Sequence, residues 1–474
     1  MRRPLQSFIV LIAIYCAVVF LIPRPDSIKP ESWRLLGIFV ATIAGLILQP
    51  IAGGALVLIA ITLAALFGGL TIQRALTGYS DPVVWLVLAA FFISIALLKT
   101  GLARRIALLF VRTFGSTSLG VCYSLGLTDF VLAAIIPSSG ARSGGVVLPI
   151  VRSVAELYGS EPGETARKLG AFLMVGVYQT ICVVSATLLT GQASNAVAAR
   201  MAGQFLHYPI TWLSWLRAGI VPGAICMALV PWLVYRLYPP TLKRTPEAPE
   251  FARRELAAMG RMATPERIVC AVFAGVCGLW IFAPLDAAVP ALLGSGVLLA
   301  TGILKWTDVT GERAAWDVFI WYGGLFGLAR ALGEAGLTEV FARGIGSALA
   351  GYSVTVLFIT ALLIYFYAHY GFASITAHTV AMYPAFGAVM LAKGVPPGLA
   401  AFSLACFGNL CAALTNYGTT PAPMFFRLRL CSVRRLVENW VRSVTGDDSR
   451  LGNGRVRLVE VSRDLVIRDL VNYD

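Results

Sequence analysis

The sequence predicts an all-α polytopic membrane protein with two inverted-topology repeats, each carrying a re-entrant helical hairpin and an unwound transmembrane helix. Three observations predict this class. Of the 474 residues, 58% are hydrophobic and 13% are charged, which is more apolar surface than a soluble domain can bury. The apolar residues gather in runs close to the roughly 20 residues that cross a bilayer. Polar motifs also recur in the same order in both halves of the chain.

Apolar runs mark the candidate membrane spans. They include residues 8–22, 35–50, 54–70, 83–98, 169–189, 213–235, 268–283, 287–304, 318–332 and 398–414. The first run follows Arg2 and Arg3, as in a signal peptide, but no cleavage site flanked by small residues follows it. We therefore expect an uncleaved first transmembrane helix.

The net charge of +14 lies mainly between the spans. Cytoplasmic loops of membrane proteins are enriched in Lys and Arg, so this charge maps topology and does not indicate a nucleic-acid partner. With Arg2 and Arg3 inside, four crossings return the chain to the cytoplasm at Lys99, Arg104 and Arg105. The prediction is a multi-pass protein of the cytoplasmic (inner) membrane with a cytoplasmic N-terminus. The nine cysteines have no metal-type or paired spacing, so we interpret them as packing thiols.

The longest hydrophilic break, residues 235–268, is rich in Pro, Arg and Lys and is typical of a cytoplasmic linker. It divides the chain into two comparable halves. The predicted organisation is an N-terminal transmembrane helix (1–33), a first repeat (34–235), a basic linker (236–267), a second repeat (268–426) and an Arg-rich tail (427–474).

Three pairs of motifs link the two halves. They are Trp85 and Trp321, residues 138–142 (SSGAR) and 374–378 (SITAH), and residues 189–191 (LTG) and 414–416 (LTN). The first two pairs share an offset of 236, and the third pair is somewhat closer. By the count of spans, the first repeat starts outside and the second starts inside. Inverted repeats are typical of secondary transporters, whose substrate site lies near the midplane where the repeats meet.

Each repeat is predicted to contain a re-entrant hairpin, and the segment in the first repeat is too short for two full crossings. Residues 116–142 lie between basic residues that belong on the same side, which predicts a hairpin entered from the cytoplasm. Residues 353–391 hold the corresponding hairpin, entered from outside. Irregular backbone at this depth is tolerated where it lines a protein cavity. The two polar motifs are therefore predicted to be hairpin tips that face each other across a binding site.

The chemistry of the tips suits an anion. Hydroxyls at the first tip (Ser138, Ser139) and at the second (Ser374, Thr376) can donate hydrogen bonds, and the helix N-termini behind them add oriented N–H groups. Each tip also has one basic side chain. Arg142 can hold a carboxylate with two parallel hydrogen bonds, and His378 occupies the matching position, so the pair suits a ligand with two carboxylates.

A second pair of interruptions falls inside apolar helices, at residues 188–199 and 414–423. Their small, polar and proline residues, Gly191, Asn195, Asn416, Gly418 and Pro421, are expected to unwind the helices. The freed carbonyls could coordinate Na⁺ or hydrate the cavity.

Structural alternatives stand beside these interpretations. A Ser/Gly cluster is often a close-packing surface between helices, and His378 could be a hydrogen-bonded core residue. Asp129, near the middle of the first hairpin, could carry a proton or pair locally. Arg330 and Glu334 are spaced four residues apart, which favours an ion pair within one helix.

At these residues the sequence resembles the divalent anion:sodium symporter superfamily of di- and tricarboxylate transporters. The stretches GYSDPVVWLVLAAFFISIALLKTGLARRIA and PSSGARSGGVVLPI carry the likeness in the first half. GFASITAHTVAMYPAF and LTNYGTTPAPMFF resemble the branch of citrate/succinate and tartrate/succinate antiporters and the plastid 2-oxoglutarate/malate translocator. The likeness covers about residues 30–426.

The resemblance implies two half-sites, elevator-type motion of one group of elements against another, and a homodimer. The expected substrate-binding residues are Ser138, Ser139, Gly140, Arg142, Ser374, Thr376, His378, Thr415, Asn416, Gly418 and Thr419. If transport is coupled to Na⁺, the expected cation-binding residues are Ser138, Gly140, Thr190, Gly191, Asn195, Thr376 and Thr415.

The expected function is secondary active transport of small di- or tricarboxylates (succinate, malate, tartrate, 2-oxoglutarate or citrate) by anion exchange, with no enzymatic activity. In the exchanger branch a fixed cationic side chain, Arg142 or His378, could replace the ion. The alternative is Na⁺-coupled symport. An intramembrane metalloenzyme at His369 and His378 is a weaker alternative, because a hydrolytic zinc site usually has three protein ligands and His207 lies far away in the sequence. No cofactor or metal site is therefore expected, apart from possible Na⁺.

The sequence departs from the family pattern at two places. The tips have Ser139, Gly140 and Ile375 where the family usually has polar Asn, Thr and a further polar residue. From Arg427 onward the chain has ten Arg, no Lys and no apolar run long enough to span a membrane. We hypothesise that this tail is translated out of frame, the alternative being a soluble basic tail. A hydrophobic span encoded in another frame after Phe426 would support the hypothesis, and its absence from both frames would exclude it.

Overall fold

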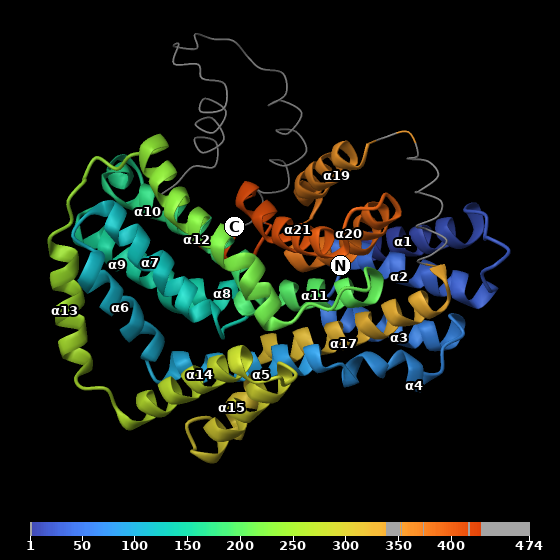
Figure 1. Cartoon of the computed structure of the whole chain (residues 1–474), viewed down its shortest axis with the longest axis horizontal. Coiled ribbons are helices and arrows are strands. Elements are labelled where there is room, and N and C mark those ends of the chain that lie inside the picture. Colours follow the sequence, from blue (N-terminus) through green and yellow to red (C-terminus); the bar gives the residue numbers. More distant parts are fainter. Residues whose placement is uncertain (1, 338–350, 352, 373, 416–417, 428–474) are drawn as a thin grey trace, which may run out of the picture. The chain divides into compact units, whose positions relative to one another are not determined.

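The computed structural model describes residues 2–337, 351, 353–372, 374–415 and 418–427. Two units divide the chain, Met1–Ser432 and Val433–Asp474, and the fold below is that of the first. Within the described ranges all regular elements are helical (Figure 1). The predicted tail lies outside the described residues from residue 428 onward.

The helices of the first half follow the predicted spans and hairpin. In chain order they are α1 (Arg2–Cys16), η1 (Ala17–Leu21), α2 (Pro30–Leu48), α3 (Gly53–Phe67), α4 (Ile72–Ala75), η2 (Thr77–Ser80), α5 (Pro82–Lys99), α6 (Leu102–Phe114), α7 (Ser118–Ala133), α8 (Ser139–Arg142), η3 (Ser143–Val147), α9 (Leu148–Leu157), η4 (Glu164–Lys168), α10 (Gly170–Thr187), η5 (Leu189–Gly191), α11 (Ala193–Phe205) and α12 (Trp212–Leu237).

The second half begins after a linker that itself contains one helix. Its elements are α13 (Glu247–Met259), α14 (Thr264–Phe282), α15 (Ala288–Ala300), α16 (Trp306–Gly311), α17 (Arg313–Glu334), α19 (Val354–Ala368), η6 (His369–Gly371), α20 (Ile375–Ala392), α21 (Pro397–Leu410), η7 (Cys411–Leu414) and α22 (Pro421–Arg427).

Eight helices are long and apolar enough to cross a membrane, counting only the part of the chain that the structure describes. They are α2, α5, α10, α12, α14, Val354–Gly371, α20 and Pro397–Leu414. This confirms the prediction of a polytopic all-α membrane protein. Shorter apolar helices occupy three other predicted spans, Gln6–Leu21, α3 and α15. The predicted span 318–332 lies in α17, which is not among the eight helices.

In both halves the segments predicted as hairpin and break contain a pair of helices joined by a turn and an interrupted helix. Because Val354–Gly371 and α20 are each long enough to cross a membrane, re-entrant hairpins in both repeats stay a prediction. In the first half the hairpin is α7 followed by α8, η3 and α9, and α10 is interrupted before α11. In the second half α19 and α20 form the hairpin, and η7 separates α21 from α22. The order of elements therefore recurs across the linker, while the inversion of the repeats in a membrane stays a prediction.

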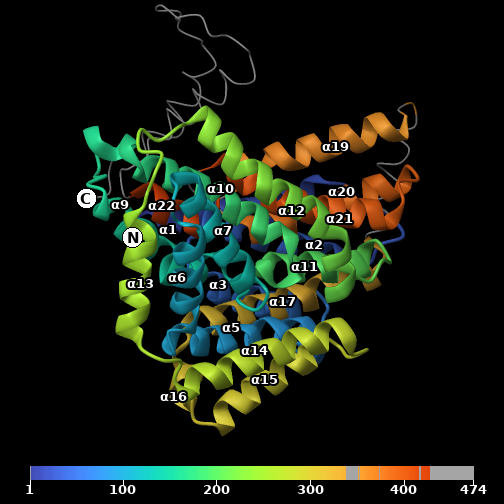
Figure 2. The ribbon, with the colours of Figure 1, turned by 60° about the vertical axis from the view of Figure 1, so that its left-hand side comes forward.

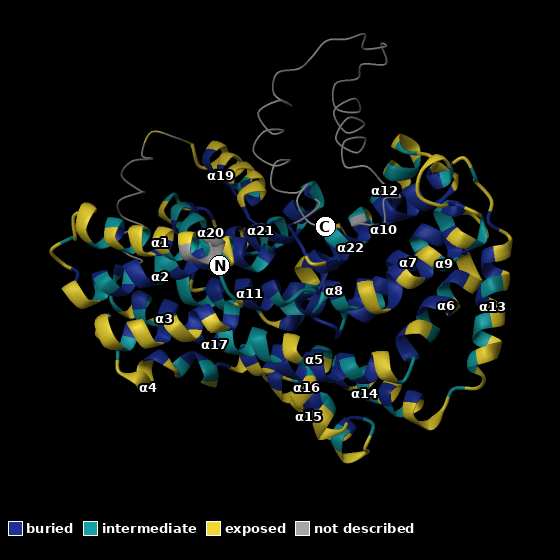
Figure 3. Cartoon of the chain, turned by 180° about the vertical axis from the view of Figure 1, so that it is seen from behind, coloured by how far each residue is buried: buried dark blue, intermediate teal, exposed yellow. Residues whose placement is uncertain are grey.

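Burial separates the central helices from those that face lipid. Of its candidate span, α10 is 94% buried, whereas α12 is 17% and α14 22% buried. Exposed large apolar side chains cover the outer faces of α12, α15 and α19 (Figure 3). Apolar residues on an outer surface suit a bilayer, so α10 forms the centre of the bundle and α12, α14 and α19 its rim.

The same local signal starts the second helix of each hairpin. Ser138 is the N-cap of α8 and accepts a hydrogen bond from the backbone N–H of Ala141 at 3.2 Å. Ser374 is the N-cap of α20 and accepts from the N–H of Ala377 at 3.5 Å. Serine caps satisfy N–H groups that a helix leaves unpaired at its start. The tip serines thus fix where each hairpin turns.

Close packing holds η2 against α17. A Cβ on Gly78 would lie 1.9 Å from the carbonyl oxygen of Gly323, and a Cβ on Gly323 would lie 2.3 Å from the ring of Tyr79. Only glycines allow this approach of the two backbones. The tyrosine hydroxyl also donates to the carbonyl of Ile320 at 2.8 Å. This contact sets the position of α5, which begins directly after η2, relative to α17.

The linker lies along one end of the bundle, where α13 runs beside α6 (Figure 2). Arg104 of α6 pairs with Glu255 of α13 at 2.5 Å. Arg105 pairs with Glu266 at the start of α14 through two contacts of 2.8 and 3.0 Å. Backbone N–H groups of the linker also donate to the carbonyls of Arg167 and Lys168. Residues predicted to be cytoplasmic from sequence therefore meet at the same end.

Candidate functional site

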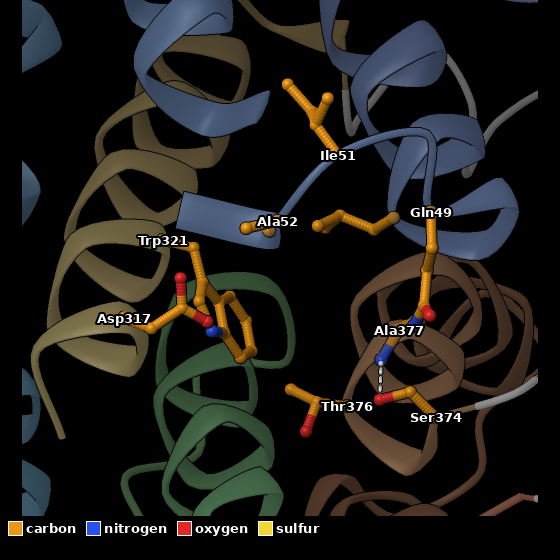
Figure 4. A pocket seen from close by; sticks show the side chains of 10 residues that line it. Gln49, Ile51, Ala52, Asp317, Trp321, Ser374, Thr376 and Ala377 are labelled. Carbon is orange, nitrogen blue, oxygen red and sulfur yellow. Dashed lines mark hydrogen bonds between the residues drawn. The ribbon is translucent and has the colours of Figure 1, made fainter. Parts of the chain in front are cut away.

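A cavity of about 540 Å³ lies beside the second hairpin tip, a volume suited to a small organic ligand. Its lining comprises Leu46, Gln49, Ile51, Ala52, Gly53, Asp317, Trp321, Ser374, Thr376 and Ala377. These residues come from three places: the end of α2 with the turn to α3 and its first residue, helix α17, and the first turn of α20. Figure 4 shows Ser374, Thr376 and Gln49 at one side, with Asp317 and Trp321 across from them.

One side of this cavity suits an anion. The N-terminus of α20 meets the cavity at Ser374, Thr376 and Ala377. Unpaired N–H groups and the helix dipole at such an end stabilise negative charge, and the Thr376 hydroxyl can donate a further hydrogen bond. The second tip thus offers the features that the sequence predicted for it.

The opposite side has a carboxylate that the sequence analysis missed. Asp317 accepts a hydrogen bond from the backbone N–H of Gly54 at 3.1 Å, which anchors α17 to the first turn of α3. No ion pair of Asp317 is found among the described residues. No Lys, Arg or His belongs to the lining, as far as the structure describes it. The cavity is therefore polarised, with hydrogen-bond donors and a helix N-terminus on one side and a carboxylate on the other.

Gln49, which the sequence analysis also missed, has an uncommon backbone conformation. It ends α2 with a φ of 48° and a ψ of 51°. A non-glycine residue in this left-handed region is conformationally unfavourable, and such residues cluster at ligand sites. The turn presents the Gln49 amide, which can both donate and accept, to the cavity beside the second tip (Figure 4).

The structure places the Arg142 side chain among protein groups and outside the described cavity lining. Its side chain is fully buried and forms a bidentate ion pair with Asp129 of α7, with Nε–Oδ1 at 2.7 Å and Nη2–Oδ2 at 3.2 Å. Nη1 donates at 2.7 Å to the carbonyls of both Ile136 and Gly191, and Nη2 lies 3.4 Å from the Ser185 hydroxyl. Arg142 thus connects both arms of the first helical hairpin to the break after α10. Asp129 forms the local ion pair that was one of the two alternatives for it.

Polar contacts also occupy the first break. The Asn195 amide donates to the carbonyls of Ser185 at 2.7 Å and Leu188 at 2.8 Å, and so bridges the interruption. The Thr190 hydroxyl donates to the carbonyl of Ala134 at the first tip at 2.7 Å. With Gly191 bonded to Arg142, several of the carbonyls expected to be free for Na⁺ accept hydrogen bonds from the protein.

The first break contacts the end of α21, and α10 contacts the start of the second break. Asn409 donates to the side-chain oxygen of Asn195 at 2.6 Å. The Tyr178 hydroxyl lies within hydrogen-bond distance of the carbonyls of Ala412, at 2.8 Å, and Thr415, at 3.1 Å. The first tip joins the same assembly, since a Cβ on Gly140 would lie 2.7 Å from the side chain of Thr420. Residues of the first tip and of the second break are therefore neighbours.

The remaining predicted residues have varied positions. Ser139, Thr415, Gly418 and Thr419 are buried, and the Gly418 N–H donates to the Thr415 hydroxyl at 2.9 Å. Asn416 lies outside the described residues. His378 is buried and is absent from the described cavity lining. Ser374 and Thr376 are thus the predicted residues that line the cavity.

Asp317 had a signal in the sequence. It follows Asp81 by 236 residues, the offset that relates the two tryptophans and the two tips. Asp81 caps α5 by accepting from the N–H of Val83 at 3.0 Å and pairs with Arg200 of α11 at 2.5 Å. Matched carboxylates thus occupy the starts of the Trp-containing segments of the two repeats. Gln49 has no corresponding motif that would have revealed it.

Interrupted helices and a polar cavity inside an apolar bundle are typical of multi-pass membrane transporters. The chain belongs to the family described as the sodium:sulfate symporter transmembrane region, whose model matches residues 3–440. This confirms the resemblance to the divalent anion:sodium symporter superfamily. Family membership also supports a transporter and not an enzyme.

Named relatives share most of the chain. YflS of Bacillus subtilis (strain 168), provisionally named a malate transporter, is 43% identical over 86% of both chains. Dicarboxylate transporter 1, chloroplastic, of Arabidopsis thaliana is 40% identical over 86% of this chain and 74% of its own length. The L-tartrate/succinate antiporter of Shigella flexneri is 33% identical over 86% of this chain and 89% of its own.

Proposed function

We propose that this protein is a secondary transporter of small dicarboxylates in the cytoplasmic membrane and that it works by anion exchange. The observation that carries the proposal is the cavity at the second tip, where the start of α20 and the Thr376 hydroxyl meet α17 and the α2–α3 turn. Of the relatives named above, one is called a dicarboxylate transporter, one is named for malate, and one is named an L-tartrate/succinate antiporter. The particular substrate among succinate, malate, tartrate, 2-oxoglutarate and citrate is left to experiment.

The proposed mechanism is an elevator motion. The moving group comprises the two hairpins and the two broken helices, α7–α11 and α19–α22. The fixed group comprises α2–α5 and α14–α17. Helix α11 contacts α20 and α21 within the moving group and α5 and α17 in the fixed group (Figure 1). Because the cavity lies between a tip and the fixed group, a shift of the tip would open and close it.

Arg142 has a positioning role in this proposal. Its charge is balanced by Asp129 and its donors face protein acceptors, so it holds the first tip and the first break in register and does not supply a free positive charge to the substrate. Arg142 is therefore not proposed as the fixed cation that replaces a coupling ion in exchange. The contact of Asn195 with Asn409 at the end of α21 would keep both half-sites together during the motion.

A second candidate, cation-coupled uptake, is favoured by Asp317. A carboxylate without an ion-pair partner in the described part of the chain lines the same cavity as the anion-binding tip. Its negative charge would repel a dicarboxylate unless a cation or a proton accompanies the substrate. In cation-coupled transport, the cation would bind near Asp317 while the substrate carboxylate binds at the second tip.

Transport into proteoliposomes tests these alternatives. The full chain is reconstituted, and uptake of labelled succinate and 2-oxoglutarate is measured with an internal dicarboxylate load or with an inward Na⁺ gradient. Uptake that requires the internal load and is indifferent to Na⁺ supports exchange. Uptake into empty vesicles driven by Na⁺ contradicts exchange and supports the second candidate. Absence of saturable uptake of either substrate under both conditions contradicts the proposed function.

A further inference from the structure

A buried cluster of nitrogen and sulfur ligands lies behind the second tip. His369 of η6, His378 of α20 and Cys411 of η7 each place one such atom so that all three lie within 4.8 Å of one another. All three side chains are buried. The cluster joins the turn of the second hairpin to the break after α21.

The protonation of His378 is set by its neighbour. Its Nε2 lies 2.9 Å from the carbonyl oxygen of Tyr365. A carbonyl can only accept, so Nε2 carries the proton and Nδ1 carries the lone pair. Nδ1 is buried and has no hydrogen-bond partner among the described residues. A histidine that donates its other N–H to a backbone carbonyl is the usual arrangement of a metal ligand.

In His369 both ring nitrogens are available to bind a ligand. Both of its ring nitrogens are buried without a well-formed hydrogen bond within the described ranges, and the Gly418 backbone lies beside the ring. Buried polar side-chain atoms in native proteins nearly always have a partner. The ring of His369 packs edge-on to that of His378, with centroids 5.3 Å apart. A ligand bound between the two rings would satisfy one nitrogen of each.

Cys411 supplies the third ligand. Its Sγ lies 3.1 Å from the carbonyl oxygen of Gly408, to which the thiol can donate. Binding of a divalent cation at the sulfur would release the thiol proton and leave a thiolate bound to the metal. Two neutral imidazoles and one thiolate suit zinc and other borderline or soft transition metals better than Na⁺ or Mg²⁺.

We propose that His369, His378 and Cys411 bind one zinc-type divalent metal ion, and that this ion fixes the second hairpin against the break behind it. The fixed tip could no longer shift to open and close the cavity, and transport would be arrested. The ligand atoms would draw together by roughly 1 Å from their widest spacing to reach zinc-ligand distances of about 2.0–2.3 Å. Three protein ligands leave a fourth tetrahedral position open. The arrest of transport rests on the proposed function, whereas metal binding does not.

Cobalt substitution tests the metal site directly. Co²⁺ is titrated into the purified full chain, and absorption from thiolate-to-cobalt charge transfer is recorded with the bound metal per chain. The expected result is one Co²⁺ per chain, displaced by Zn²⁺. Cys411→Ser should remove the charge-transfer band, and His369→Gln should weaken Co²⁺ binding at least tenfold. Cys406→Ser, a cysteine outside the cluster, and His207→Asn should leave both unchanged.

The overturning results are equally specific. Failure of the full chain to bind Co²⁺, or binding with a charge-transfer band that persists in Cys411→Ser, would reject the site. Transport gives the second readout: Zn²⁺ should inhibit uptake by the full chain at least tenfold more strongly than uptake by Cys411→Ser, each relative to its own zinc-free rate. Equal inhibition of both would reject the role of the ion in fixing the hairpin. Cobalt binding with the expected variant pattern but without dicarboxylate uptake would uphold the metal site and reject the proposed function alone.

Discussion

Arg142 shows how a charge can reside inside an apolar bundle. Burial of a guanidinium is unfavourable unless its donors and its charge are matched. Here Asp129 balances the charge, and two backbone carbonyls and a serine hydroxyl lie near the remaining donors. The residue that interrupts the apolar run therefore organises the first tip and the first break.

We expect Arg142→Ala to destabilise the protein by about 3–5 kcal/mol, because it leaves a buried carboxylate without a partner. Thermal unfolding in detergent measures the effect. Arg330→Ala is the matched control, since Arg330 and Glu334 form an exposed pair at 3.0 Å whose loss should change stability by about 0–1 kcal/mol. The double variant Arg142→Met, Asp129→Leu should recover part of the lost stability. Equal effects of Arg142→Ala and Arg330→Ala would contradict the structural role.

Thr376 is the residue at which the cavity can be tested with least disturbance. Thr376→Val keeps the shape of the side chain and removes the hydroxyl. If that hydroxyl donates to a substrate carboxylate, its loss weakens binding by about 1.5–3 kcal/mol, or roughly tenfold to a hundredfold. Uptake measured over a range of succinate concentrations should show a raised KM. The control Thr301→Val, at an exposed position after α15, should have the same KM as the unaltered chain. A similar KM for both variants would show that the Thr376 hydroxyl does not bind the substrate.

At the scale of helices and hairpins, much could be predicted from sequence and some could not. Apolar run length and the recurring Trp, tip and break motifs located the hairpins and breaks, because each depends on local composition. The pairing of Arg142 with Asp129 was not predicted. The two residues lie on different helices of the first hairpin, α8 and α7, and only the geometry of the turn brings them together. Gln49 was missed for the same reason, because the packing of α2 against α20 is a tertiary property, whereas Asp317 follows Asp81 at the offset of 236 and could have been found from the repeat.

Helix α11 offers a test of relative motion. Arg200 of α11 pairs with Asp81 at the start of α5 at 2.5 Å, so the pair joins the proposed moving group to the proposed fixed group. Breaking it should destabilise the observed state by about 0.5–1.5 kcal/mol and shift the population of states by roughly twofold to tenfold. Reactivity of a cysteine introduced at Thr376 reports the shift. Arg200→Gln and Asp81→Asn should give the same change, with no further change in the double variant.

The exposed pair between Arg74 of α4 and Glu334 of α17, at 3.3 Å, is the matched control for this motion. Both helices belong to the fixed group, so Arg74→Gln should leave the cysteine reactivity unchanged. An equal shift from Arg74→Gln, or additive effects of Arg200→Gln and Asp81→Asn, would mean that the Asp81–Arg200 pair does not report movement between the groups.

At the scale of the whole described unit, ion pairs gather at the end that carries the linker. Besides the contacts of α6 with α13 and α14, Lys99 pairs with Asp308 at 2.6 Å. The Lys99 ammonium, with lesser help from the Lys305 backbone N–H, lowers the pKa of Asp308 below its usual value. A carboxylate with a lowered pKa stabilises the fold above its unfolded-state pKa, and that contribution is lost as the pH falls through the lowered value. The pair therefore persists at neutral pH.

This common end makes the inverted topology testable. Asp26 lies just before α2 and Arg261 just before α14, and both are exposed. If the two repeats are inverted, these corresponding positions lie on opposite sides of the membrane, with Arg261 on the side of the basic linker. Single cysteines at each position, in a transport-competent background with the nine native cysteines replaced, are treated in intact cells with a thiol reagent that cannot cross the membrane.

Labelling of Asp26→Cys in intact cells, and of Arg261→Cys only after permeabilisation, is the expected result. It follows from the concentration of Lys and Arg on the cytoplasmic side. Arg253→Cys on α13 should behave like Arg261→Cys, because both belong to the linker end of the bundle, and Leu285→Cys in the exposed turn after α14 should behave like Asp26→Cys. The reverse labelling pattern at all four positions would mean that the whole protein has the opposite orientation in the membrane, with the two repeats still inverted relative to each other. Labelling of Asp26→Cys and Arg261→Cys from one side would reject it, since the two repeats would then enter the membrane in the same direction and could not place their tips on opposing sides of one site.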